Sequence, residues 1–435
     1  MRKALFVLLT GLTALHAAPA PPAAEFPLKD GDLWVMAGDS ITAQHLHSNY
    51  FEAFCYARYP QLKFAFRNSG VGGHTIPTTL ARFEYDIAAW KPTVVSVELG
   101  MNDKGGTAVD KFVANMGTMV ERIRGAKARP VILAASPVNN GDTMARLGGN
   151  QRLHEYAVAL KEFSAREAIP YADQFHLLLD LWGANKPREV VANSVNALRQ
   201  VAGDDGVAGI EHLRAFLAAQ EKSAVKPVSM QGDPVHPGPN GQLMMAAALL
   251  KELGADGFVS SAALDAGGKL VEAKGCAIDA VKADGGRIEF DRLDKRLPFP
   301  IPDEARAIVA FYPTILDLSR YTLKVTDLKG AVAFKINGIP TATLTAKELE
   351  AGVNLTPFGG SNPIAVQMRA ILAAVGAKEG IVGQWRSLSQ KAHAVGADPG
   401  LKEQLAALTR KVEEADAKIR DAARPQKLHF ELAPQ

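Results

Sequence analysis

The chain lacks several features that mark specialised classes of protein. Its 435 residues include 49 basic and 46 acidic side chains, so it has no large charge surplus of either sign. A dedicated nucleic-acid-binding protein would need a basic surplus to neutralise phosphates, and the near balance argues against that class. No apolar run after the first 20 residues is long enough to span a bilayer, so no integral membrane segment is expected beyond that point.

Cysteine is also scarce. Only Cys55 and Cys276 are present and no CxxC pair occurs, so neither a disulfide-stapled scaffold nor a zinc ribbon is expected. Two alternatives remain open for these cysteines: both are buried free thiols, or they form one intramolecular disulfide. What is present is ordinary for a folded protein: 47% of the residues are hydrophobic and 22% are charged. The length exceeds what one core usually holds, so more than one domain is expected.

The N-terminus has the pattern of a secretory signal. Arg2 and Lys3 precede an uncharged, Leu- and Ala-rich run over residues 4–18, and three prolines follow within residues 19–22. We predict a signal peptide over residues 1–20 and a secreted or periplasmic location. A membrane anchor is the alternative, although the run is shorter than the ~20 residues of a spanning helix.

Residues 25–257 alternate short apolar runs with longer amphipathic ones. Alternation of this kind predicts an α/β domain, a parallel sheet with helices on both faces. Strands are expected near residues 33–36, 63–66, 93–99, 131–135 and 169–172. Helices are expected near residues 40–58, 77–90, 109–126, 150–167 and 240–253. Residues 173–232 do not follow this alternation and are interpreted as an insertion. It is expected to be a loop with short helices near residues 189–200 and 210–220. It forms either a wall of the site or a peripheral segment without a role in the site.

The pattern of hydrophobic and polar residues changes after residue 257. Short strand patterns separated by Gly, Asp and Pro predict a small β-rich module over residues 258–356. One of these strand patterns lies at residues 307–311. Residues 357–435 are predicted to form a helical tail, a hairpin that packs back on the body of the protein. No internal repeat is apparent.

Four short segments carry candidate chemistry, and three of them follow strands of the predicted parallel sheet. They are Gly38-Asp39-Ser40-Ile41, the glycine loop over residues 68–73, Gly100-Met101-Asn102-Asp103, and a segment over residues 233–237 before the last helix of the domain. Ligands bind at the carboxyl ends of the strands in open α/β sheets. The segments therefore predict one site at this edge.

These segments supply the groups that acyl transfer needs. A serine hydroxyl attacks only when a base takes its proton, and His236 is the candidate base for Ser40. Asp233 lies three residues before His236, close enough to orient the imidazole and to stabilise its cation. The backbone N–H of Ser40 at a strand-to-helix turn, an N–H of the glycine loop and the side-chain amide of Asn102 can bind a developing oxyanion.

In this order and on these elements, the four motifs resemble the SGNH (GDSL-type) hydrolase family. The resemblance covers about residues 32–255 and implies a three-layer, flavodoxin-like α/β core. It implies a catalytic triad of Ser40, Asp233 and His236, with no cofactor and no metal. It places the oxyanion hole on Ser40, Gly73 and Asn102, with Gly70 and Gly72 as rival glycines. No Gly-x-Ser-x-Gly elbow surrounds Ser40, which argues against the α/β-hydrolase fold.

Other polar and aromatic residues are weaker candidates for a role in the site. His45 and His47 follow the proposed nucleophile and are expected to be solvent-facing or packed, with a place in the pocket as the alternative. Neither belongs to an HExxH pattern. Asn139 and Trp182 are expected in loops and are the candidate substrate-binding residues, through a hydrogen bond to a sugar or stacking on it, with ordinary loop packing as the alternative.

Three classes of function remain open. The leading hypothesis is an exported esterase that cleaves short acyl esters, acetate on carbohydrate, in a small-molecule or polysaccharide substrate. A lipase, lysophospholipase or O-acetyltransferase would use the same site. A carbohydrate-binding or scaffold protein with a vestigial site is the third class. The tail, including Gln384-Trp385-Arg386, is similar to tails of exported SGNH proteins of planctomycete and verrucomicrobial type, which suggests lineage and not substrate. The oligomeric state is not predicted.

Overall fold

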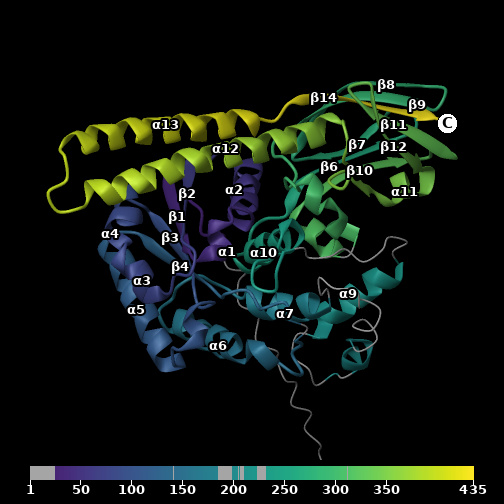
Figure 1. The fold of residues 1–435 in the computed structure, drawn as a ribbon. Helices are drawn as coiled ribbons and strands as arrows, with labels where there is room; N and C mark the ends of the chain where they lie inside the picture. Colours follow the sequence, from purple (N-terminus) through teal and green to yellow (C-terminus); the bar gives the residue numbers. More distant parts are fainter. Residues whose placement is uncertain are drawn as a thin grey trace, which may run out of the picture.

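A five-stranded parallel sheet lies at the centre of the N-terminal domain (Figure 1). The structure, a computed structural model, describes residues 25–140, 142–184, 198–203, 205, 210–222, 232–310 and 312–435. The predicted signal peptide and parts of the predicted insertion lie outside the described residues. The strand order is β2-β1-β3-β4-β5. The bounds are β1 Asp32–Gly38, β2 Phe64–Gly70, β3 Val94–Glu98, β4 Arg129–Leu133 and β5 Tyr171–Ala172.

This order is the flavodoxin-like order that the family resemblance implied. All five strands are there. The central strands β1, β3 and β4 are buried along almost their whole length, because helices cover both faces of the sheet. The helices are α1 Ser40–Ala43, α2 His47–Arg58, α3 Ile76–Ala81, α4 Phe83–Asp86, α5 Val109–Gly125, α6 Gln151–Arg166, α7 Gln174–Ala184, α9 Ile210–Lys222 and α10 Pro239–Glu252.

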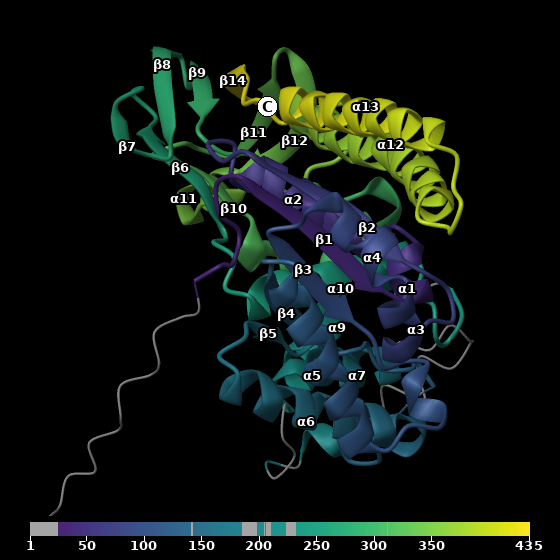
Figure 2. The ribbon, with the colours of Figure 1, turned by 90° about the vertical axis from the view of Figure 1, so that its left-hand side faces the viewer.

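Two helix groups form the outer layers. Helices α2, α7 and α10 pack together on one side of the sheet, and α3, α5 and α6 lie on the other (Figures 1 and 2). Some boundaries differ from the prediction. The predicted helix over 40–58 is interrupted at His45, which has φ 56°, and the one over 77–90 is divided into α3, α4 and a 3₁₀ turn, Ala88–Trp90. Helix α7 lies where the sequence predicted a loop.

The C-terminal β-rich part holds two further sheets around a core of its own. One sheet has the order β13-β10-β6-β7 and the other β12-β11-β14-β9-β8. The strands are β6 Phe258–Asp265, β7 Leu270–Lys274, β8 Cys276–Asp284, β9 Arg287–Asp294, β10 Arg320–Thr326, β11 Ala331–Ile336, β12 Ile339–Thr345, β13 Val353–Asn354 and β14 Lys427–Pro434. Helix α11, Ala346–Ala351, follows β12. Residues 307–311, predicted as a strand, lie largely in a 3₁₀ helix, Asp303–Ala310, which joins the first core through Ile308.

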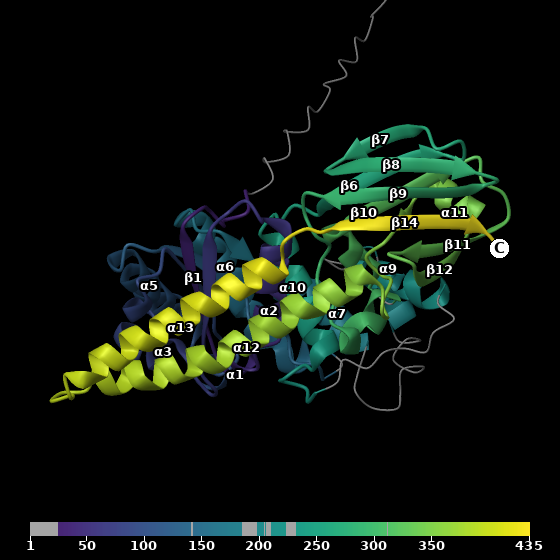
Figure 3. The ribbon, with the colours of Figure 1, turned by 90° about the horizontal axis from the view of Figure 1, so that it is seen from above.

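The helical tail consists of α12, Pro363–Ala392, and α13, Gly400–Ala422, which pack on each other as a hairpin. The predicted tail, residues 357–435, holds its helical hairpin up to Ala422, but its last residues form a strand that the sequence pattern did not indicate. There β14 pairs with β9 and β11 in the second β-sheet, so the chain returns to the β-rich part after the hairpin. Figure 3 shows the two helices crossing the N-terminal domain. No helix in the described ranges combines the length and apolar character of a membrane span.

Both cysteines are buried free thiols, and they lie in different parts of the fold. Cys55 is on α2 in the first core, and Cys276 begins β8 in the second. Burial raises the pKa of each thiol, which favours the neutral form. The two residues therefore have packing roles here.

Candidate functional site

Ser40 is the first residue of α1, immediately after β1, at the carboxyl edge of the sheet. Asp39 caps this helix, because its Oδ1 accepts the Ile41 N–H at 2.9 Å. Gly38 allows the helix to fold back tightly, since a Cβ there would lie 2.0 Å from Thr42 Oγ1. Helix α1 has only four residues, so the long helix dipole expected behind Ser40 is reduced to one turn.

The structure brings Ser40, His236 and Asp233 into one hydrogen-bonded line. Ser40 Oγ lies 2.8 Å from His236 Nε2, and His236 Nδ1 lies 2.9 Å from Asp233 Oδ2. The two loops come together across 196 residues of sequence. Asp233 and His236 lie on the segment before α10, which packs against α2. The predicted spacing thus corresponds to a real juxtaposition.

The hydrogen bonds fix the tautomer of His236. A carboxylate only accepts, so His236 Nδ1 carries the proton that faces Asp233, and neutral Nε2 accepts from the Ser40 hydroxyl. Asp233 Oδ1 also accepts the N–H groups of Val235 and His236 at 2.7 and 2.8 Å. Slight burial raises the pKa of Asp233, but these hydrogen bonds outweigh it and hold that pKa below its usual range.

Asn102 projects its side-chain amide toward the same turn. Its Nδ2 donates to the His74 carbonyl at 3.0 Å and lies 3.4 Å from Asp39 Oδ2. The amide is therefore held by the glycine loop on one side and by the residue before Ser40 on the other. Such a donor needs little reorganisation before it binds a developing oxyanion.

The glycines of the loop have different environments. The Gly70 N–H donates to Asn68 Oδ1 at 2.8 Å, and a Cβ on Gly70 would lie 2.4 Å from the Ala43 nitrogen. Gly70 is thus needed for the close approach of α1 and is not the oxyanion donor. A Cβ on Gly72 would lie 3.8 Å from Ser40 Cβ, and Gly73 has φ 75°, where glycine is favoured. Gly73 stays the predicted donor, with Gly72 beside the serine.

Asp39 is a buried carboxyl next to Ser40 in the chain, with 3% of its surface exposed. Burial raises its pKa to about 7, with the nearby Glu98 adding to the rise, although the Ile41 N–H and the histidines oppose it. Its contacts to Ile41 and Asn102 give Asp39 a structural hydrogen-bonding role.

A buried polar network lies beneath the nucleophile turn, and its members are far apart in sequence. His47 Nε2 is 3.1 Å from Glu98 Oε2, and its Nδ1 is 2.6 Å from Gln242 Oε1. Both partners accept, so both ring nitrogens donate. Burial lowers the pKa of His47, but the Glu98 charge and these hydrogen bonds outweigh burial and raise it. Gln174 Nε2 donates to the other oxygen of Glu98 at 2.8 Å.

Sequence reasoning missed Glu98 and Gln242 because neither belongs to a motif. Glu98 is the last residue of β3, and a charged residue at the end of an otherwise apolar strand was the available signal. His47 is packed, as expected, and is 1% exposed. His45 pairs with Glu379 of α12, with 3.1 Å between Nδ1 and Oε2.

The two candidate substrate-binding residues lie in different environments: one is beside the site and the other is in the core. The Asn139 N–H donates to the Pro234 carbonyl at 2.7 Å, so Asn139 lies beside the Asp233–His236 segment and connects it to the loop after β4. The prediction for Trp182 is wrong. Trp182 lies on α7, not in a loop, and its indole is fully buried in the core, so it presents no face to a sugar.

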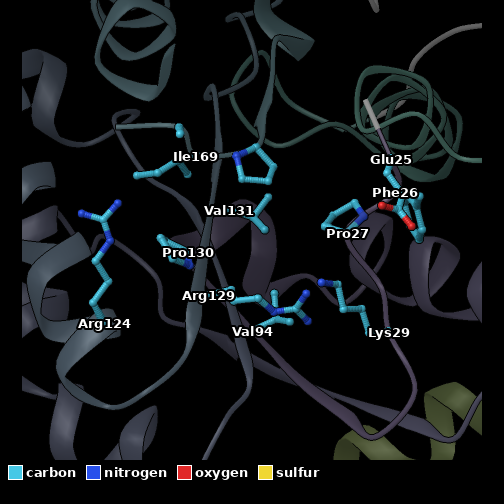
Figure 4. A pocket seen from close by; sticks show the side chains of 12 residues that line it. Glu25, Phe26, Pro27, Lys29, Val94, Arg124, Arg129, Pro130, Val131 and Ile169 are labelled. Atoms are coloured by element: carbon cyan, nitrogen blue, oxygen red, sulfur yellow. The ribbon is translucent and has the colours of Figure 1, made fainter. Parts of the chain in front are cut away.

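One cavity, of about 310 Å³, lies away from these residues (Figure 4). It is lined by the starts of β3 and β4 and by residues 25–29, at the edge of the sheet opposite to Ser40. Two of its lining cations are in ion pairs: Arg129 contacts Asp32, and Arg124 contacts Glu167. Within the described ranges, no group of three acidic, His or Cys side chains is arranged to bind a metal ion.

Comparisons with known proteins agree with the fold. Residues 36–187 match the model of the GDSL-like Lipase/Acylhydrolase family. The chain is 23% identical over 208 residues to an acetylxylan esterase of Geobacillus stearothermophilus, covering 47% of this chain and 79% of that protein. The solved structure of a gut microbial diltiazem-metabolizing enzyme superposes with a TM-score of 0.72 at 21% identity, over 95% of this chain and 99% of that one. A crystal structure of the acetylxylan esterase Axe2 from Geobacillus stearothermophilus gives a TM-score of 0.38 at 19% identity, over 52% of this chain and 95% of that one.

Proposed function

We propose that this chain, an SGNH-type esterase whose residues 36–187 match the GDSL-like family, uses Ser40 as the nucleophile of an acyl-enzyme mechanism. The observation that carries the proposal is the hydrogen-bonded line from Ser40 Oγ through His236 to Asp233. A hydroxyl, a base in the correct tautomer and an anion behind that base are the parts that ester cleavage by serine requires.

In the first half of the reaction, Ser40 Oγ attacks the ester carbonyl and its proton passes to His236 Nε2. The imidazolium is stabilised by Asp233, whose Oδ2 faces Nδ1 at 2.9 Å. The oxyanion accepts hydrogen bonds from the Ser40 N–H, the Gly73 N–H and Asn102 Nδ2. Each such donor lowers the barrier by about 3–4 kcal/mol. The alcohol leaves with the proton from Nε2.

In the second half, water attacks the acyl-Ser40 carbonyl and gives its proton to His236 Nε2. The same donors stabilise the second oxyanion. Collapse of that intermediate returns the proton to Ser40 Oγ and releases the carboxylic acid. All proton transfers of both halves pass through His236.

We propose an acetyl ester on carbohydrate as the substrate class and an exported location for the protein. The substrate proposal is supported by the acetylxylan esterase relative, although at 23% identity. The location rests on the sequence pattern of residues 1–20. Asn139, beside the catalytic segment, stays the candidate for contact with the alcohol part of the ester.

The test is hydrolysis of 4-nitrophenyl acetate by the wild type, by Ser40→Ala and by a matched variant, Ser389→Ala, whose hydroxyl lies on α12 and donates to the Tyr85 carbonyl. We expect hydrolysis by the wild type and the matched variant and a loss of at least about 10³-fold in Ser40→Ala. An inactive wild type, or full activity in Ser40→Ala, would contradict the proposal.

A second pair of measurements tests the substrate class. A series of 4-nitrophenyl esters of increasing acyl length is expected to give the highest kcat/KM for acetate. A preference for long chains would favour a lipase and contradict the acetyl assignment. Release of acetate from acetylated xylan, followed directly, is expected for the wild type and not for Ser40→Ala.

A further inference from the structure

Helix α12 of the C-terminal hairpin contacts the segment that follows α1, the helix that begins at Ser40, and it also contacts the glycine loop. Its residue Glu379 pairs with His45, directly after the turn that carries Ser40. Seven residues later, on the same face of the helix, Arg386 reaches the glycine loop. The helix lies along this edge of the N-terminal domain (Figure 3). One helix from the C-terminal region thus contacts both the segment that follows α1 and the glycine loop.

Arg386 makes three hydrogen bonds that fix its guanidinium. Its Nε and Nη2 donate to the two carboxylate oxygens of Asp86 at 2.6 and 2.8 Å, and Nη1 donates to the Gly70 carbonyl at 3.0 Å. The bidentate pair fixes the plane of the guanidinium. The third bond then holds Gly70, the last residue of β2, which lies within the glycine loop.

The contact continues toward the oxyanion donors through buried side chains. Asp86, 2% exposed, also pairs with Arg82, which is 3% exposed. Arg82 donates from Nε to His74 Nδ1 at 3.2 Å, and its Nη2 lies 3.4 Å from the Gly38 carbonyl. The His74 carbonyl accepts the Asn102 amide.

Charge explains why the cluster needs Arg386. Burial raises the pKa of Asp86, but its hydrogen bond and charge interaction with Arg386, together with Arg82, outweigh burial and lower that pKa. Without Arg386, the buried carboxylate would lose the partner that reaches both its oxygens. Arg82 would then have to shift toward Asp86, and it holds His74.

We propose that Arg386 is a positioning residue for the oxyanion hole, so that the C-terminal hairpin is part of the machinery for ester hydrolysis. This inference rests on the proposed function of Ser40. Arg386 touches no reacting atom. It acts by keeping Gly70, Asp86 and, through Arg82, His74 in the geometry that Asn102 and the loop N–H need in the transition state. A displacement of about 1 Å at such a site costs up to about 10²-fold in rate.

The hairpin is anchored independently of Arg386, which makes the idea testable. Trp385 stacks on Trp90 with 3.4 Å between ring centroids, and Arg67 pairs with Asp416 at 2.7 Å in a buried ion pair. Arg420 of α13 provides a matched control, because its Nη1 donates to the Phe64 carbonyl at 3.0 Å, at the opposite end of the same strand β2.

The experiment compares Arg386→Met, Arg386→Lys and Arg420→Met in the full chain, with kcat and KM for 4-nitrophenyl acetate and the melting temperature of each. We expect Arg386→Met to lower kcat and kcat/KM together by about 10- to 100-fold with KM nearly unchanged, because the lost interactions act in the transition state. Lysine cannot form the bidentate pair, so Arg386→Lys should lower kcat by at least about fivefold. Arg420→Met should keep kcat within about twofold of the wild type.

The outcomes separate the two proposals. If the wild type hydrolyses the ester and both Arg386 variants keep its kcat, the positioning role is wrong, whatever happens to the melting temperature. If Arg420→Met loses kcat as much as Arg386→Met, the hairpin contributes stability only and the inference also fails. If Arg386→Met does not fold, Arg386→Lys alone decides by the same criterion. An inactive wild type would remove the proposed function and this inference with it.

Discussion

Replacing Asp39 by asparagine is expected to change how the stability of the protein depends on pH. Asp39 is 3% exposed, and its pKa is raised from 3.8 to about 7, mainly by burial. An asparagine has the same shape and still offers Oδ1 to the Ile41 N–H, so the helix cap is kept. The variant therefore removes the ionisation and leaves the cap.

The sign and the size follow from linkage. Between pH 3.8 and about 7, the folded protein holds a proton on Asp39 that the unfolded chain has released. The folded state binds more protons there, so the Asp39 contribution to stability falls as pH rises through this window and stays low above it. Each pH unit within this window lowers the Asp39 contribution by about 1.4 kcal/mol. Between pH 5 and pH 8 only the two units up to about pH 7 count, so the loss is about 3 kcal/mol. Asparagine removes this loss.

The assay is urea unfolding followed by tryptophan fluorescence at pH 5 and pH 8, for the wild type and Asp39→Asn. Trp34 on β1 reports on the domain that contains Asp39. We expect the free energy of unfolding of the variant, relative to the wild type, to increase by about 3 kcal/mol between the two pH values. Asp421→Asn, on an exposed carboxylate of α13, should give a curve parallel to the wild type. Parallel curves for Asp39→Asn would refute the argument that burial controls this carboxyl.

Three further substitutions test the site and the core. Asn102→Ala removes one oxyanion donor and should lower kcat for 4-nitrophenyl acetate by about 10²- to 10³-fold with KM little changed; an unchanged kcat would exclude Asn102 from the hole. Asp233→Asn should lower kcat by up to about 10⁴-fold. The melting temperature should stay near that of the wild type, because the Asp233 side chain is 59% exposed. A large drop in melting temperature with normal kcat would assign Asp233 a structural role. Trp182→Ala should cost about 3–5 kcal/mol in urea unfolding because its indole is fully buried; a rise in KM without loss of stability would restore Trp182 to the substrate site.

The local parts of the fold could be predicted from the sequence because their signals are local. Val-rich runs between helical patterns indicated the strands, and turn residues after β1 and β3 indicated where Ser40 and Asn102 would lie. The Asp233–His236 spacing is short enough that one loop sets its geometry. These are the features that the structure reproduces most closely.

The features that were missed depend on distant contacts. Helix α7 packs against α10, a contact that no local pattern shows, and Trp182 on α7 is fully buried. Strand β14 lies in a sheet with β9 and β11 although a long helical hairpin separates it from them in sequence, so its partners could not be foreseen. Arg386 was part of a noted sequence segment, but its link to Asp86 joins residues 300 positions apart.

The most direct test of the central claim is covalent capture of the nucleophile. The protein is incubated with diethyl 4-nitrophenyl phosphate, whose phosphorus Ser40 Oγ should attack with release of 4-nitrophenolate. The account predicts one diethyl phosphoryl group per chain, located by peptide mass spectrometry on Ser40, together with loss of 4-nitrophenyl acetate hydrolysis in proportion to labelling. A label on another residue, or full hydrolysis by protein fully labelled on Ser40, would contradict it.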